Sequence, residues 1–162
     1  MIFEADLSKK QIHIVREFNA PVEKLWRALT EPELLDQWVG PKPWKAETKT
    51  MNFTVGGNWL YAMVNPDGYK LWVYAQFTAI ETGNMFSSMG VYCDTDGNPA
   101  LDGPKSYRTT KLSAIEGNRT ALEMLITFEE EATYNLFADG GFKQGTEICN
   151  NQLDELLASN QL

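Results

Sequence analysis

The chain has 162 residues, which suits a single domain with a substantial core, and we take residues 1–162 as one domain. Its formal net charge is −8 and its basic residues are scattered, so nucleic acid and anionic membrane surfaces are poor partners. No apolar stretch reaches the roughly 18 residues of a membrane span. No secretory signal opens the chain, and Cys93 and Cys149 lie far apart. We therefore expect a cytoplasmic protein with reduced thiols, no membrane insertion and no metal site.

The N-terminal part predicts a strand followed by two short helices. Residues 11–18 (QIHIVREF) alternate between apolar and polar side chains and are rich in β-branched residues, as in a strand. Asn19 and Pro21 then suit a helix start, with Asn19 as the cap. Residues 22–30 carry apolar side chains at helical spacing. A second helix opens with a proline over residues 32–39 and ends at a Gly-Pro pair.

From residue 45 to about residue 127 the apolar residues recur with period two, which predicts six further strands. Turn residues such as Pro-Asp-Gly at 66–68 and Gly-Asn at 117–118 separate them. The six segments are KAETKTMNF, NWLYAMV, YKLWVYAQFTAI, NMFSSMGVYC, YRTTKLSAIE and RTALEMLITFE. Short connections between successive strands indicate an antiparallel meander. The loop at 94–104 is the longest irregular piece, and we place it at a hairpin tip that tolerates insertions.

The last part of the chain returns to helical spacing, over residues 142–157, after Gly140 and Gly141. An antiparallel sheet needs an apolar cover on one face, and this helix is the only large amphipathic element available. We therefore expect it to lie across the sheet. A twisted sheet that curls around one helix need not close on it completely, so a pocket between the two is expected.

Large rings are frequent in this chain, with five Trp, six Tyr and eight Phe. Rings with one polar atom suit the walls of a pocket, although any single Trp also fits a packed core. Trp38 and Trp44 flank the Gly-Pro turn, and we interpret that turn as the rim of an apolar cavity. The candidate ligand-binding residues are Trp38, Trp44, Phe53, Trp59, Phe77, Met89, Phe128 and Phe142.

Catalytic and metal-binding patterns are weak. His13 is the sole histidine and lies on the strand face opposite its isoleucines, where we expect solvent rather than a catalytic centre. The run Asp94-Thr95-Asp96-Gly97-Asn98 begins like a calcium loop but lacks the later ligands, so we interpret it as a turn. Either Arg108 or Lys111 would suit an anionic ligand head group, because a charge inside a pocket needs a partner.

Several motifs resemble one known family. The stretch IVREFNAPVEKLWRALTEPELLDQWVGP at 14–41, Phe-x-Val-Gly-Gly-x-Trp at 53–59, Pro-Asp-Gly at 66–68 and Phe-x-Ala-Ile at 77–80 resemble the START/SRPBCC superfamily. They are most similar to its AHSA-like branch, named after the activator of the heat-shock protein 90 ATPase. The resemblance covers residues 12 to about 157. Branch members commonly have Gly-Trp where this chain has Gly141-Phe142.

What the resemblance implies is an α+β helix-grip fold, in which a seven-stranded antiparallel sheet grips the C-terminal helix around an apolar cavity. Members of the superfamily bind lipids, sterols and polyketides, and some are cyclases or aromatases. The resemblance implies no shared catalytic residue and no cofactor.

Three functions follow from this resemblance. The first is a non-catalytic protein that binds a hydrophobic, lipid-like or polyketide-like molecule. The second is a cyclase- or aromatase-type enzyme, for which Tyr61, Tyr92 and Arg108 are the candidate groups. The third is a co-chaperone-like module that binds a heat-shock protein.

Overall fold

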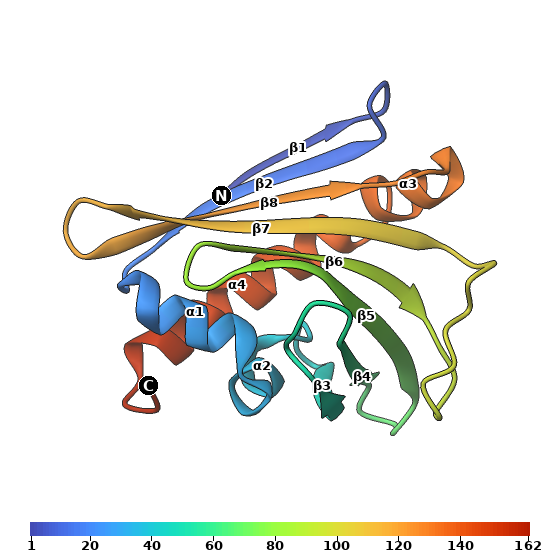
Figure 1. The fold of residues 1–162 in the computed structure, drawn as a ribbon, viewed down its shortest axis with the longest axis horizontal. Coiled ribbons are helices and arrows are strands. Elements are labelled where there is room, and N and C mark those ends of the chain that lie inside the picture. The colour runs from blue at the N-terminus through green and yellow to red at the C-terminus, as the bar shows by residue number, and fades with distance from the viewer.

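The computed structural model describes residues 1–162 and contains one antiparallel sheet of eight strands and four helices (Figure 1). The elements in chain order are β1 (Ile2–Asp6), β2 (Gln11–Phe18), α1 (Val22–Thr30), α2 (Pro32–Trp38), β3 (Lys45–Met51), β4 (Asn58–Val64), β5 (Lys70–Glu81), β6 (Met85–Tyr92), β7 (Lys105–Ile115), β8 (Arg119–Thr127), α3 (Glu131–Ala138) and α4 (Phe142–Ala158). The α+β helix-grip order of strand, two helices, six strands and terminal helix is confirmed. The sequence pattern does not predict β1 or α3, and β1 makes the sheet eight-stranded rather than seven-stranded.

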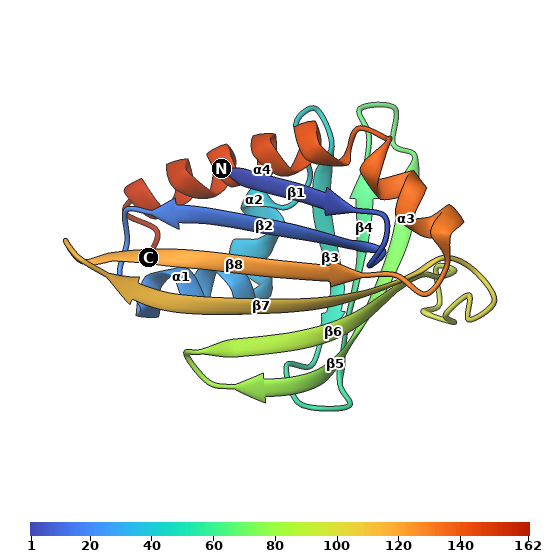
Figure 2. The same cartoon turned by 90° about the horizontal axis from the view of Figure 1, so that it is seen from above.

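The strands lie in the order β1-β2-β8-β7-β6-β5-β4-β3, all antiparallel to their neighbours. The chain therefore crosses from β2 to the far edge through α1 and α2, and the meander returns to close against β2. Figure 2 shows β3 and β4 running at a steep angle to β2 and β8. Register shifts between Thr48 and Thr50 and between Phe77 and Ala79 accompany this curvature, because a bulge increases local twist.

The start of α1 differs from the prediction. Pro21 is the N-cap residue, in extended conformation, and no side chain caps the helix. The predicted capping role of Asn19 is therefore wrong, since the helix begins at Val22, too far along the chain for the Asn19 side chain to reach its first amides. Proline at this position already presets the backbone for helix entry.

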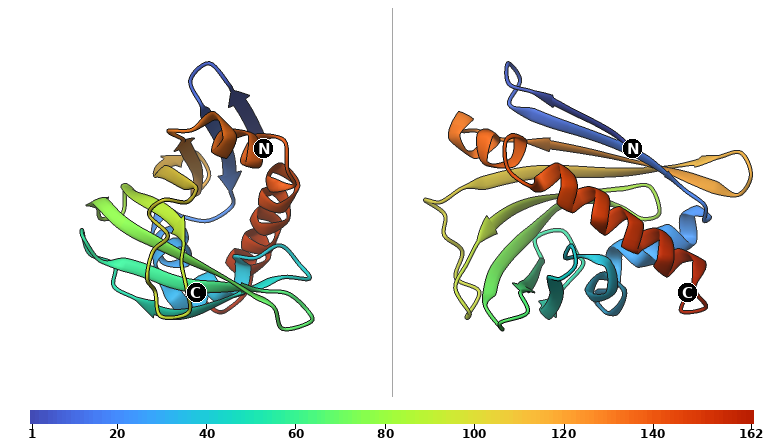
Figure 3. Two further views of the ribbon diagram at one scale, coloured as in Figure 1. Left: turned by 90° about the vertical axis from the view of Figure 1, so that its right-hand side faces the viewer. Right: turned by 180° about the vertical axis from the view of Figure 1, so that it is seen from behind.

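Helix α4 lies across the concave face of the sheet (Figure 3). The inward residues Ile12 and Ile14 of β2 are at most 1% exposed, which follows from the alternation of that strand. The main core joins α1, the C-terminal half of α4 and the strands beneath them; its buried members are Phe18, Ala20, Leu25, Ala28, Leu29, Leu34, Leu112, Leu122, Leu153, Leu156 and Leu157. A smaller cluster joins β2 and the end of β8 to Tyr134 of α3; its buried members are Ile12, Ile14, Ile126, Phe128 and Tyr134.

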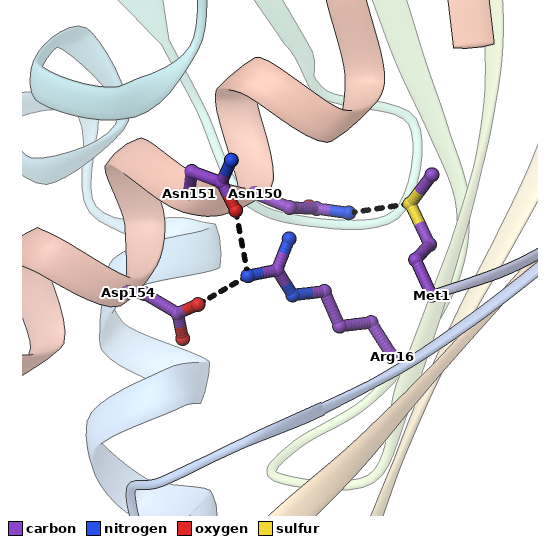
Figure 4. Close-up of polar contacts among 5 residues, drawn as sticks. All are labelled: Met1, Arg16, Asn150, Asn151 and Asp154. Carbon is purple, nitrogen blue, oxygen red and sulfur yellow. Dashed lines mark hydrogen bonds and ion pairs between the residues drawn. The ribbon is translucent and has the colours of Figure 1, made fainter. Parts of the chain in front are cut away.

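A polar contact fastens α4 to the β2 side of the sheet. The Arg16 guanidinium donates to Asn151 Oδ1 at 2.9 Å and also to the Asp154 carboxylate (Figure 4). Beside it, Asn150 Nδ2 lies 3.4 Å from the sulfur of Met1. These contacts couple β1 and β2 to the middle of the helix.

A second polar contact fastens α4 to the turn after α2. The Gln152 side chain donates to the carbonyls of Trp38 and Gly40, at 2.8 and 2.9 Å, and accepts from the Lys42 amide at 3.1 Å. Gly40 has φ of 101°, and a Cβ there would lie 2.8 Å from the Cα of Lys45, so the turn requires glycine. The Gly-Pro sequence thus ends α2 and brings the turn against α4.

Candidate ligand-binding site

The register of the sheet identifies the side chains that face α4 in its central part. Arg108 of β7 is opposite Ile126 of β8 on one side and Ser88 of β6 on the other. Phe77 of β5 continues that row. Because directly opposed residues share a face and Ile126 is in the core, the whole row faces inward.

Small side chains occupy the centre of this inward face. Ala75, Gly90 and Ser106 form one row across β5, β6 and β7, and Ser88 lies in the next row. Ser106 is buried, whereas Ala75, Ser88 and Gly90 are only partly buried. Small residues opposite a helix leave space that larger ones would fill. The interior is therefore less densely occupied here than beneath α1.

Arg108 and Tyr61 lie at this place with no polar partner. Protein surrounds both side chains, yet both retain solvent-accessible surface. Neither the Arg108 guanidinium nor the Tyr61 hydroxyl makes a hydrogen bond or ion pair. Every side-chain nitrogen or oxygen that water cannot reach has a hydrogen-bond partner in this protein. The polar ends of Arg108 and Tyr61 therefore border an interior space that water can reach.

Burial shifts the pKa values of both Tyr61 and Arg108. Burial raises the pKa of Tyr61 to about 12, partly offset by the nearby positive charge of Arg108. Burial lowers the pKa of the Arg108 guanidinium, and Tyr61 opposes that shift. On α4, burial raises the pKa of the Cys149 thiol, while a hydrogen bond from the Gly40 backbone counteracts it. At neutral pH the interior thus presents one cation, a neutral phenol and a neutral thiol.

Two of the predicted site residues, Phe53 and Phe77, meet in one aromatic cluster. Their ring centroids are 4.8 Å apart, and Phe86 and Trp26 complete the group, with Trp26 5.9 Å from Phe53 and 5.7 Å from Phe86. Phe77 and Phe86 lie on the inward face of β5 and β6. This cluster forms an apolar wall on the β5–β6 side of Arg108.

Trp59 lies on the inward face of β4, stacked on Tyr61 with ring centroids 3.8 Å apart. Its Nε1 donates to Thr48 Oγ1 at 2.9 Å, and that hydroxyl donates to Asp36 of α2 at 2.6 Å. The stack holds the Tyr61 ring in place beside the central space.

Trp38 and Trp44 do not contact each other, and neither belongs to the aromatic cluster or to the Trp59–Tyr61 stack. Trp38 packs against the main core and donates its Nε1 to the Ala28 carbonyl at 2.8 Å. Trp44 contacts Tyr69, whose side chain is exposed, with centroids 6.4 Å apart. The turn between them touches α4 through Gln152, so its observed contacts are structural.

The remaining predicted residues lie in three different places. Phe142 begins α4, and the Arg108 guanidinium carbon lies 6.0 Å from its ring centroid. Phe128 is buried beneath α3, 4.8 Å from the Phe137 ring. Met89 pairs with Gln76 and Tyr107, which places it on the convex face, away from α4.

The polar residues considered from the sequence also lie on different faces of the sheet. Arg108 faces inward, whereas Lys111, three residues later on β7, is exposed on the convex face. His13 pairs with Glu123 on that outer face, at 2.9 Å. The small residues at 75, 88, 90 and 106 were missing from the prediction, because a small residue in a strand carries no sign of the space it leaves.

The loop at 94–104 joins β6 to β7 at a hairpin tip, as predicted, and it also contacts β3 and β4. The Asp94 carboxylate accepts from the amides of Asp96 and Asn98 and from the Asn98 side chain, which holds the pKa of Asp94 below its usual range. The Lys49 ammonium donates to the Thr95 carbonyl at 2.6 Å, and Gly97 lies against the Leu60 side chain. The loop therefore folds back over the outer face of β4, and the Asp94 carboxylate stabilises the predicted turn.

An open cleft of about 510 Å³ lies elsewhere, between α4 and the edge formed by β1 and β2. Two pairs of charged groups in or beside it are formed within the protein, Arg16 with Asp154 and Arg119 with Glu17, whereas the lining residue Glu147 makes no ion pair. No cluster of potential metal ligands is present, and no helix is long and apolar enough to cross a membrane.

Comparison with known proteins identifies the family and supports the fold. Residues 19–158 match the family model of activator of Hsp90 ATPase homolog 1-like proteins. No curated protein matches the sequence significantly. Among solved structures, a protein from Arthrobacter aurescens is 33% identical with a TM-score of 0.89, covering 98% of this chain and 91% of that one. Protein Ms6760 from Mycobacterium smegmatis is 27% identical with a TM-score of 0.88, covering 100% and 99%.

Proposed function

From the premise that the chain belongs to the family of activator of Hsp90 ATPase homolog 1-like proteins, we propose that it binds a hydrophobic small molecule between the sheet and α4. The ligand would lie against the aromatic cluster of Trp26, Phe53, Phe77 and Phe86. Burial of its apolar surface would drive binding, at roughly 25 cal/mol per Å².

The observation that carries this proposal is the interior surface around Arg108 and Tyr61. Enclosed side chains that still border accessible space are the mark of an unfilled interior, since protein cores are otherwise close-packed. Small residues line the same place, and aromatic rings flank it on two sides. A preformed, mostly apolar site with a few convergent polar groups is the usual form of a small-molecule site.

Tyr61 favours binding over catalysis. A cyclase-type reaction needs an acid or base whose pKa lies near the operating pH. Burial moves the pKa of Tyr61 to about 12, further from neutrality. A phenol of this kind serves as a neutral hydrogen-bond donor to a ligand rather than as a proton-transfer group.

The test is a titration with decanol, an uncharged apolar probe, monitored by the amide signals of the labelled protein in NMR. We expect saturable shifts at residues around Ala75, Tyr61 and Phe77. Ala75→Leu fills the interior space and should weaken binding by about tenfold or more, since overpacking of a filled site costs about 1–3 kcal/mol. Ala79→Leu is the matched control, because the register shift on β5 turns Ala79 to the convex face.

Ala79→Leu should leave decanol binding unchanged. Mass spectrometry of the native protein provides an independent readout through any molecule that co-purifies. Failure of decanol and other neutral apolar probes to bind the wild-type protein, with no co-purified molecule, would remove the proposal.

A further inference from the structure

We propose that the interior site selects an amphiphile with a single carboxylate, whose head group pairs with Arg108 and accepts a hydrogen bond from Tyr61. This inference rests on the proposed function and names the class of its ligand. It starts from the unpaired Arg108 guanidinium inside the protein.

The chain leaves this cation unneutralised although carboxylates are abundant. It has 22 acidic and 14 basic residues. The other inward arginine, Arg16, pairs with Asp154. Tyr61 of the sheet is the titratable group beside Arg108, and Cys149 of α4 lies near Tyr61; burial raises the pKa of both, so neither carries a negative charge at neutral pH. An enclosed charge without a partner is costly, so its retention indicates an anion that arrives with the ligand.

The geometry indicates that the ligand carries a single negative charge and that the charged group is planar. Only one guanidinium is present, so a monoanion neutralises it, whereas a dianion would leave a net negative charge in the enclosed space. Guanidinium binds a carboxylate through two parallel hydrogen bonds. The Tyr61 hydroxyl, whose aromatic ring is held by Trp59, supplies a further neutral donor.

Apolar walls lie on both sides of this head-group position. Phe142 lies next to the Arg108 guanidinium at the start of α4. On the other side, Phe77 is two strands from Arg108 in the same inward row. Neighbouring strands are about 4.8 Å apart, so Phe77 and its cluster are about 10 Å from the Arg108 backbone. An apolar body of roughly that length, such as a medium acyl chain or two fused rings, joins the two positions.

The experiment compares decanoate with decanol, which has the same chain without the charge, by calorimetric titration at neutral pH. We expect the wild-type protein to bind decanoate about 10- to 100-fold more tightly, because a hydrogen bond to a charged group contributes about 1.5–3 kcal/mol. Arg108→Met should abolish that preference and leave decanol binding in place. Lys111→Met removes a cation from the convex face of the same strand and should leave the preference unchanged.

Tyr61→Phe should weaken decanoate binding by a smaller factor, about 3- to 10-fold, since one hydrogen bond is lost. The outcomes separate the two proposals. Equal binding of decanoate and decanol by the wild-type protein overturns the carboxylate inference but retains the proposed function. An undiminished preference in Arg108→Met also overturns it. Absence of binding of either molecule overturns both, and the wild-type comparison decides the matter even where a variant fails to fold.

Discussion

Under the C-terminal half of α4, Phe18, Leu112 and Leu122 are at most 4% exposed and pack against Leu153. Under its N-terminal half, the inward residues Ala75 and Ser88 of the sheet retain accessible surface. The same helix covers both regions, and both lie on one continuous sheet (Figure 3). The difference lies in the side chains, which are large and apolar in the first region, whereas the second combines small residues and Arg108 with flanking aromatic rings.

The two regions therefore have different roles, one in stability and the other in the proposed binding. The packed region, joined by α1, supplies the burial that holds α4 on the sheet. The second region surrounds Arg108 and Tyr61, whose polar ends have no partner, and there we propose the ligand site. Residues kept for binding are commonly costly for stability, and an unpaired cation in the interior is such a residue. Five predictions test whether the two regions differ as described.

The largest effect is expected in the packed region. Leu153 is fully buried in the main core, so Leu153→Ala should lower the free energy of unfolding by about 2–5 kcal/mol. Ala75→Leu, which adds volume in the other region, should change it by about 1 kcal/mol or less. Urea denaturation measures both. A large loss for Ala75→Leu would show that the second region is packed as tightly as the first.

The Gln152 contact holds α4 at the turn after α2, beside both regions. Gln152→Ala leaves two carbonyls without their partner and should cost about 2–3 kcal/mol in unfolding free energy. Asn151→Ala, one residue earlier on the exposed side, removes only one hydrogen bond to Arg16 and should cost about 1 kcal/mol or less. Equal effects of the two substitutions would contradict a specific role for Gln152.

Alkaline pH should act through Tyr61. Its folded pKa, about 12, is above the ordinary value of 10.0, so the unfolded chain loses this proton first as pH rises. The stability that the neutral phenol contributes is present below pH 10 and is lost as pH rises toward 12. Between these values the wild-type protein should lose about 1–3 kcal/mol more than Tyr61→Phe. Parallel pH dependences of the two proteins, measured by urea denaturation, would place Tyr61 in contact with bulk solvent.

Removal of the interior cation should stabilise the ligand-free protein. Arg108→Met replaces an unpaired charge with an apolar side chain of similar length, and we expect a gain of about 1–2 kcal/mol. Thermal and urea denaturation of the ligand-free proteins measure this change. A loss of stability would mean that the Arg108 stem provides packing that methionine cannot replace, and the contrast between the regions would weaken.

The smallest effect is expected outside the concave face. His13 and Glu123 form a half-exposed pair on the convex side. Exposed pairs of this kind contribute little, so His13→Ala should change the unfolding free energy by about 0.5 kcal/mol or less. A loss above about 1 kcal/mol in urea denaturation would show that the convex face also contributes to holding the fold.

Much of the fold was predictable because it depends on local patterns. The alternation of residues 11–18, the six period-two segments and the helical spacing after Phe142 each reflect one strand or helix with one buried face. The β1 strand was not predicted, because Ile2 and its neighbours are mostly exposed and pair through backbone to β2. The predicted capping role of Asn19 is wrong because Pro21 is the N-cap residue of α1.

The positions of the candidate site residues were predictable only in part. The rings at Phe53, Phe77, Trp59 and Phe142 do lie on the inward side or beside Arg108, as large apolar residues in amphipathic strands and helices tend to. Met89 lies on the convex face, because its neighbour Ser88 is opposite Arg108 on the inward face and successive residues of a strand alternate. A shift of one residue reverses which side chains face the core, and a single sequence does not reveal register.

The sequence by itself determined the class of the fold and the closing helix, because period and turn chemistry act over a few residues. Only the tertiary structure decided that Arg108 has no partner and that Ala75, Ser88, Gly90 and Ser106 come together beside it. Those residues belong to three strands, and what surrounds a side chain depends on which strands pair and in which register. The surroundings of Arg108 are a property of that assembly, because they depend on the atoms that each neighbouring element supplies.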